Sequence, residues 1–311
     1  MLLEYGADVE MVPEDSYYGK GREVSHTPLL RAYQRSDRNM IKSLLDKGAN
    51  LHTLTGNYDA NDSFLEILCL MNRILDVKTI LDWGLDISLG LPAACFKGHL
   101  ELVQLLLDSG INPDVQNAKF GDPLGAASYG GHINIVQLLL KGGATVNASF
   151  SIYGGPLLAA SIKGHNQVVQ TLLDHRADPN GSFGSIQESL KQRFQAPGRQ
   201  AGSWFSIARY GNALQAASQA GHEDTAQLLL TSGADVKIRG GEYGSAIVAS
   251  TFKGHKGMIK LLLEAGANVD VLDGSWGHVL EEDWHKWHND IVRDLIANHS
   301  VSYMKATTRR T

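Results

Sequence analysis

The chain has 311 residues, of which 43% are hydrophobic and 20% are charged, and its formal net charge is −5 at pH 7. This acidic balance disfavours binding of nucleic acid or of a membrane surface along the whole chain, because those partners attract an excess of Lys and Arg. Cys69 and Cys95 lie in apolar stretches, and no apolar run reaches about eighteen residues. We therefore expect an intracellular protein, cytoplasmic or nuclear, without disulfides or membrane spans.

The N-terminal segment 1–10, MLLEYGADVE, has the pattern of a helix end. Leu2 and Leu3 lead into Gly6, a residue that suits a helix C-cap, and similar phrases recur further along the chain. We expect segment 1–10 to be the last third of a repeat whose first helix is missing. Either the chain is the C-terminal part of a longer array, which is the interpretation favoured here, or residues 1–26 fray and Leu2 and Leu3 pack only loosely.

Internal repeats occupy residues 27–270. Clear copies include AASYGGHINIVQLLLKGGATVN (126–147) and AASIKGHNQVVQTLLDHRADPN (159–180). A first helix with paired Ala residues precedes Gly-His, and a second helix carries apolar residues three or four apart. No copy can bury its apolar faces alone, so the copies must stack. Seven copies are predicted, at 27–51, 63–87, 89–114, 122–147, 155–180, 212–236 and 245–270.

Each copy carries start and stop signals for its helices. A Pro stands at the first helical position in some copies, and the Gly of Gly-His is expected to end the first helix in a left-handed conformation. A second Gly ends the second helix, except that Arg176 takes its place in one copy, which costs about 1 kcal/mol if the residue is left-handed. The predicted N-cap residues of the first helices are Thr27, Ser63, Asp122, Asn212 and Ser245.

The spacing of the second capping glycines shows where the array is irregular. Gly110 and Gly143 are 33 residues apart, whereas Gly84 precedes Gly110 by 26 and Gly233 follows Gly143 by 90. The short interval predicts a short connection, and the long one predicts an insertion at 181–211. That insertion is locally basic, with Lys191, Arg193, Arg199 and Arg209 against Glu188. It is either a surface loop or a binding loop over the array.

Segments outside the regular copies have simpler interpretations. Residues 10–26 and 52–62 are expected to form extended hairpins. After residue 270 the first-helix pattern becomes polar and rich in Trp, which is typical of a terminal capping repeat, here 277–300. The tail 301–311 is expected to be disordered.

The repeats resemble ankyrin repeats, whose pattern runs TPLxxAAxxGHxxVVxLLLxxGADVN. The resemblance covers about seven copies between residues 27 and 270. It implies an all-α solenoid of stacked helix-turn-helix units with β-hairpin-like loops. The long hairpins with YGNALQAAS also resemble ankyrin arrays of filamentous-fungal proteins, including NACHT-type receptors.

The sequence offers no catalytic constellation, so we expect neither an enzyme nor a cofactor or metal site. Walker, HExxH, CxxC and G-x-S-x-G motifs are absent. His285 and His288 have the spacing of metal ligands, but a third ligand is not evident. Five further histidines occupy the same Gly-His position in successive copies, which predicts a structural hydrogen bond to the adjacent repeat: His99, His132, His165, His222 and His255.

The resemblance implies a concave face built from hairpin tips and the ends of the first helices. Aromatic and basic residues gather at those positions, a composition suited to a protein interface. The tyrosines that precede Gly in the hairpins could instead lock each hairpin against its helix. The candidate protein-binding residues are Phe96, Lys97, Tyr129, Ile162, Lys163, Phe252, Lys253, Tyr153, Tyr243 and Trp204.

Three functional hypotheses follow from this reading. The first is a protein-interaction scaffold or adaptor, expected to be monomeric, which binds an unidentified protein partner through the concave face and does not bind nucleic acid or a membrane directly. The second is a transcription coregulator, for example of a fungal metabolic gene cluster. The third is the C-terminal fragment of a larger NACHT-type receptor.

Overall fold

The computed structural model describes residues 27–35, 37–50, 54–55, 62–117, 119–148, 153–181 and 210–267, together with Val9. The predicted capping repeat at 277–300, the tail, the hairpin at 10–26, nearly all of the partial repeat at 1–10 and most of the insertion at 181–211 lie outside the described residues. The boundaries predicted for those segments therefore stay predictions.

The chain divides into two compact units, residues 1–115 and 116–311. Unit 1 contains helices α1 (Pro28–Gln34), α2 (Arg38–Asp46), α3 (Phe64–Leu70), α4 (Ile74–Asp82), α5 (Leu91–Lys97) and α6 (Leu100–Asp108), the strands β1 (Leu54–Thr55) and β2 (Asp62–Ser63), and the 3₁₀ turn η3 (Ser88–Gly90). Unit 2 contains α7 (Pro123–Gly130), α8 (Ile133–Lys141), α9 (Pro156–Lys163), α10 (Asn166–Asp174), α12 (Ala213–Ala220), α13 (Glu223–Thr231), α14 (Ala246–Lys253) and α15 (Lys256–Glu264).

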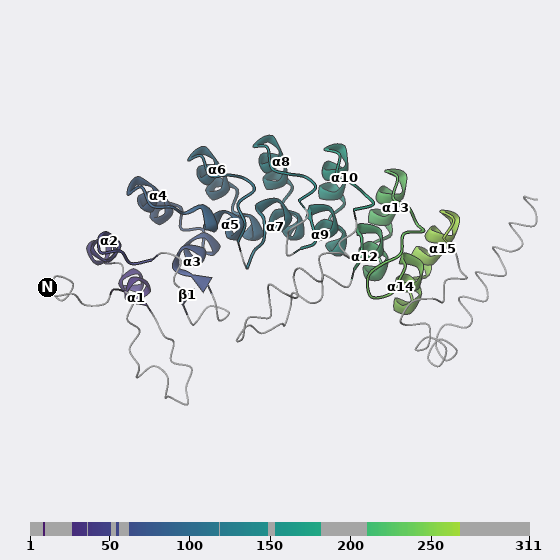
Figure 1. Cartoon of the computed structure of the whole chain (residues 1–311), viewed down its shortest axis with the longest axis horizontal. Coiled ribbons are helices and arrows are strands. Elements are labelled where there is room, and N and C mark those ends of the chain that lie inside the picture. Colours follow the sequence, from purple (N-terminus) through teal and green to yellow (C-terminus); the bar gives the residue numbers. More distant parts are fainter. Residues whose placement is uncertain are drawn as a thin grey trace, which may run out of the picture. The chain divides into compact units, whose positions relative to one another are not determined.

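Each unit is a stack of helix-turn-helix pairs arranged in two layers (Figure 1). In unit 2 the first helices α7, α9, α12 and α14 pack side by side, and so do the second helices α8, α10, α13 and α15. In unit 1, α3 packs on α5 and α4 packs on α6. The all-α stack of helix-turn-helix units predicted from the sequence is confirmed.

The residues between the layers explain why the pairs stack. Val136 and Leu139 of α8 are fully buried, in agreement with their three-to-four spacing. The paired alanines of the first helices, such as Ala126 and Ala127, are also fully buried. Their small side chains let neighbouring first helices approach closely, so the apolar surface of each pair is covered by the next.

In unit 2 the predicted N-caps of the first helices are formed. Asp122 accepts a hydrogen bond from the amide of Gly125 at 2.6 Å, and Ser245 accepts one from Val248 at 3.4 Å. Asn212 forms a reciprocal capping box with Gln215. Pro123 and Pro156 begin α7 and α9, where a missing amide proton costs little.

The connections in unit 1 follow the irregular spacing of the sequence. Between Gly84 and α5 the chain makes only the turn η3, so the short connection predicted there is confirmed. A β-carbon on Gly90 would lie 2.5 Å from Sγ of Cys69, because this turn passes directly over α3. Strands β1 and β2 pair antiparallel, with Leu54 opposite Ser63, as expected for a hairpin at 52–62.

The insertion does not interrupt the stack of unit 2. Helix α9 packs on α12, and α10 packs on α13, although residues 182–209 separate them in the chain. The side chain of Asn180 donates to the carbonyl oxygen of Gly233 at 3.0 Å and accepts from the amide of Asp235 at 2.7 Å. The repeats on either side of the insertion therefore pack directly on each other.

Candidate protein-interaction face

The junction between the two helices of a pair has the same construction in the five pairs from α5–α6 to α14–α15. The first helix ends at a left-handed Gly, with φ of 81° at Gly98, 74° at Gly131 and 70° at Gly164. Asn72 takes this position at the end of α3 with φ of 56°. The sequence prediction of left-handed glycines is confirmed, and Asn is a residue that tolerates the same conformation.

The histidine after this Gly joins one repeat to the preceding one. Nε2 of His165 lies 3.1 Å from the carbonyl oxygen of Tyr129, and the equivalent distances are 2.9 Å for His99 to Leu70, 3.2 Å for His222 to Ile162 and 3.1 Å for His255 to Gln219. A carbonyl oxygen only accepts, so Nε2 carries the proton and donates it. The predicted structural role is confirmed for these four histidines.

The residues just before the left-handed Gly end each first helix, and in unit 2 two of them, Tyr129 and Phe252, contact an aromatic ring of a hairpin. In unit 2, Tyr129 stacks on Tyr153, with ring centroids 5.0 Å apart and planes inclined by 25°. The Lys163 ammonium lies 4.7 Å from the centroid of the Tyr129 ring. The hairpin preceding α9, the end of α7 and the end of α9 therefore meet in one aromatic–lysine cluster.

Burial distinguishes the two tyrosines of this cluster. Tyr153 is only 4% exposed, whereas Tyr129 is half-buried. Burial raises the pKa of Tyr153 well above its ordinary value of 10, and the nearby Tyr129 and Asp122 add to the rise, so the phenol stays neutral. Tyr153 therefore packs against Tyr129 but has little solvent-accessible surface itself.

A second cluster lies at the end of α14. Phe252 is 42% exposed, and its ring lies 5.1 Å from that of Tyr243 in the preceding hairpin. The ammonium of Lys253 is 5.6 Å from the centroid of Phe252. Tyr243 is half-buried, so both rings of this cluster reach the surface. Between the two clusters stands α12, which ends in Gln219 and Ala220.

The remaining predicted residues lie elsewhere. Ile162 is half-buried next to Lys163 at the end of α9. In unit 1, Phe96 is half-buried and Lys97 is exposed, with its ammonium 5.7 Å from the Phe96 ring. Trp204 lies outside the described residues, so its predicted role rests on the sequence alone.

Comparison with known protein families identifies the family of the repeats. Ankyrin repeats match residues 91–182 as three copies, and single ankyrin repeats match 212–241 and 246–274. The chain is an ankyrin-repeat protein. No curated protein matches it. Ankyrin repeats generally mediate protein–protein interaction, so the surface residues rather than a catalytic motif are where function is to be sought.

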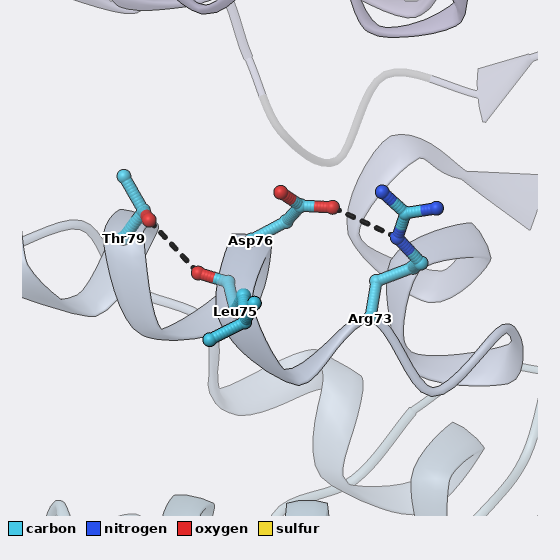
Figure 2. Close-up of polar contacts among 4 residues, drawn as sticks. All are labelled: Arg73, Leu75, Asp76 and Thr79. Atoms are coloured by element: carbon cyan, nitrogen blue, oxygen red, sulfur yellow. Dashed lines mark hydrogen bonds and ion pairs between the residues drawn. The ribbon is translucent and has the colours of Figure 1, made fainter. Parts of the chain in front are cut away.

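One link between repeats of this ankyrin-repeat protein departs from the histidine pattern. Arg73 occupies the histidine position before α4, and its guanidinium lies 5.3 Å from the Tyr33 ring centroid in the preceding repeat. Figure 2 shows Nε of Arg73 facing Asp76, with 2.9 Å between Nε and Oδ2. A cation–π contact thus replaces the histidine bond. Alignment of Asn72-Arg73 with the Gly-His pairs of the other copies could have shown from the sequence that this link differs.

A second set of links was also missed by sequence reasoning. The side chain of Asn147 donates to the carbonyl oxygen of Arg176 at 3.2 Å and accepts from the amide of Asp178 at 2.9 Å. Asn180 makes the same two bonds to the following repeat. The last Asn of the copies at 126–147 and 159–180 therefore ties its hairpin to the next one. Its fixed place in the copies at 126–147 and 159–180 could have indicated this role.

The described residues offer little for chemistry. Cys69 and Cys95 are fully buried, and burial, with Glu66 as a second cause, raises the pKa of the Cys69 thiol to about 12. Among the described residues, no three His, Cys, Asp or Glu side chains gather to hold a metal ion. In the same part of the chain, no helix has the length and apolar character to span a membrane. His285 and His288 lie outside it.

Proposed function

We propose that the chain is a non-enzymatic protein-interaction module whose binding surface is the aromatic–lysine face. We define this face as Tyr129, Ile162, Lys163, Tyr243, Phe252 and Lys253 in unit 2. Phe96 and Lys97 are a separate candidate pair at the equivalent position in unit 1. The observation that carries the proposal is the exposed Phe252 ring, held against Tyr243 at the end of a first helix.

The aromatic rings of this face are preorganised for binding. An aromatic side chain that leaves water at an interface contributes more than most residues, and interface hot spots are enriched in such rings. Phe252 and Tyr129 are each held by a neighbouring ring, so they lose little conformational freedom when a partner binds. Phe252 and Tyr243 both reach the surface, so a partner that covers them removes two neighbouring aromatic rings from water.

The experiment is affinity capture from a cell extract with mass spectrometry, using the full chain and a variant carrying Phe96→Ala, Tyr129→Ala and Phe252→Ala. The variant should lose the partner that the unchanged chain enriches, while its circular dichroism spectrum stays helical. Leu100→Ala is the matched control, because Leu100 is 41% exposed but begins the second helix α6. Equal capture by the triple variant and the control would rule out this face.

The identity of the captured protein then separates the finer hypotheses. A DNA-binding protein that accumulates with the chain in the nucleus supports a transcription coregulator. A partner that is confined to the cytoplasm and unrelated to transcription supports a scaffold or adaptor. Repeating the capture with a chain that lacks the residues between Gly181 and Tyr210 tests whether the insertion takes part.

A further inference from the structure

Two asparagines of unit 2 make equivalent links between neighbouring hairpins but differ in the residue that follows them. Asn147 and Asn180 each donate to a carbonyl oxygen and accept from an amide of the next repeat. Ala148 follows Asn147, whereas Gly181 follows Asn180, and Asn180-Gly181 is the only Asn-Gly pair in the sequence. The two links therefore have the same hydrogen bonds but different covalent chemistry.

An Asn-Gly pair can lose its side-chain amide in water without an enzyme. Hydroxide removes the proton from the backbone nitrogen of the Gly, and this nitrogen attacks Cγ of the Asn. The bond between Cγ and Nδ2 then breaks, and ammonia leaves with a proton taken back from water. Water opens the resulting cyclic imide at either carbonyl group, which gives Asp or isoaspartate. A side chain on the following residue hinders the ring closure, and Gly has none.

The folded hairpin holds the reacting atoms of Asn180 but leaves them close to solvent. Its Nδ2 donates to the carbonyl oxygen of Gly233 at 3.0 Å, and the Gly181 amide donates to the carbonyl oxygen of Asp178 at 3.3 Å. Asn180 and Gly181 are both half-buried. These bonds lie outside the helices, so a local opening of the hairpin releases both groups while α10 and α12 stay folded.

We propose that Asn180 is a deamidation site, and that its conversion to Asp breaks the link between the repeats on either side of the insertion. An Asn side chain both donates and accepts, whereas a carboxylate only accepts. The bond from the Asp235 amide can therefore persist, but the carbonyl oxygen of Gly233 loses its donor and faces a carboxylate oxygen. Asn147 retains both of its bonds, so the change is confined to one junction of the array.

The new charge also arises near two existing carboxylates. Oδ1 of Asp178 accepts from the backbone amide of Asn180 at 2.9 Å, and Asp235 supplies the amide that the Asn180 side chain binds. Both aspartates are exposed. Because like charges at short separation repel, deamidation replaces an attraction between neighbouring hairpins by a repulsion.

The test of the site is peptide mapping by mass spectrometry after the full chain has been incubated at mildly alkaline pH. The tryptic peptides 142–163 and 177–191 each contain a single Asn, which is Asn147 in the first and Asn180 in the second. The mass change from amide to acid should appear at Asn180 several times faster than at Asn147.

Two variants exchange the residue that follows each asparagine. Gly181→Ala fits the fold, because the nearest atom to its β-carbon is the carbonyl oxygen of Asp178 at 3.4 Å. It should slow deamidation of Asn180 to the rate at Asn147, and Ala148→Gly should raise the rate at Asn147. Equal rates at the two asparagines of the unchanged chain, or undiminished deamidation in Gly181→Ala, would overturn the inference.

The effect on the link is measured by thermal denaturation of the same samples. Incubation should lower the melting temperature of the unchanged chain, but not that of Gly181→Ala. Asn180→Asp should reproduce the lower melting temperature without incubation, with a larger shift at low salt, where charges are less screened. If Asn180→Asp melts at the temperature of the unchanged chain, deamidation does not break a stabilising link and the inference is wrong.

Discussion

Nε2 of His222 lies 3.2 Å from the carbonyl oxygen of Ile162, a residue 60 positions earlier in the chain. The equivalent link from His165 reaches back only 36 positions, to Tyr129. The same contact therefore forms whether or not the insertion intervenes. Thr225 and Asn166 make a further bond between the same two repeats, with 2.5 Å between Oγ1 and Oδ1.

Shortening the insertion should leave the fold intact. The connection from Asn180 to Asn212 spans 32 residues, against 8 from Asn147 to Gly155. Deleting 24 residues from within 182–209 would restore the shorter length. We expect the free energy of unfolding to rise by only about 1 kcal/mol, because each halving of the loop length recovers about 0.6 kcal/mol of closure entropy. Chemical denaturation measures this, and loss of a cooperative transition would contradict the packing of α9 on α12.

Arg176→Gly should stabilise the protein. Arg176 has φ of 65°, the left-handed conformation predicted for the residue that takes the place of the capping Gly. Its side chain is exposed, and its carbonyl oxygen, which accepts from Asn147, is retained in the variant. Relief of the backbone strain should raise the free energy of unfolding by about 1 kcal/mol. An unchanged or lower melting temperature would show that the strain is compensated in a way the local geometry does not reveal.

Two left-handed glycines allow backbone strain to be separated from packing. A β-carbon on Gly164 would lie 2.7 Å from Nδ1 of His222, whereas one on Gly143 would have nothing within 4 Å. Both glycines have positive φ. Gly143→Ala should therefore cost about 1 kcal/mol, and Gly164→Ala about 2–4 kcal/mol, because the histidine ring must also move. Equal losses in thermal denaturation would mean that the ring does not rest on this Gly.

The histidine links should make stability depend on pH. Burial lowers the pKa of His165 below its ordinary value of 6.5, helped by the nearby His132, Lys163 and His222, although its bond to the Tyr129 carbonyl opposes the shift. A lowered pKa in the folded state means that the unfolded chain binds more protons between the two pKa values. The resulting stabilisation is complete above pH 6.5 and is lost as the pH falls through the folded pKa.

This pH dependence can be measured by denaturation of the unchanged chain and of His165→Gln between pH 7.5 and pH 5. The unchanged chain should lose stability more steeply than the variant as the pH falls below the ordinary histidine value. Parallel curves would show that His165 has the same pKa in the folded and unfolded states. His165 would then contribute nothing to the pH dependence of stability.

Much of the fold could be predicted because each repeat carries its own local signals. Asp122, Asn212 and Ser245 cap the helices that they precede. Four histidines of the Gly-His positions bond to the preceding repeat, as their repeated position indicated. Contacts between different repeats were harder to predict than these local features. The exchange of a histidine bond for the contact between Arg73 and Tyr33 depends on which residue the preceding repeat offers.

The candidate face also combines features that the sequence predicts with features that only the structure shows. Its aromatic and basic residues could be found from the register of the first helices. Tyr153 is buried against Tyr129, whereas Phe252 stays 42% exposed. This difference depends on how each hairpin folds onto its helix.

The central claim is that the aromatic–lysine face binds a protein partner. Its most direct test is the affinity of the captured partner for the unchanged chain, for Phe252→Ala and for Leu100→Ala, measured by titration calorimetry. Loss of a hot-spot ring costs about 2 kcal/mol or more, so Phe252→Ala should weaken binding about thirtyfold while Leu100→Ala leaves it unchanged. Equal affinities for all three proteins would contradict the account.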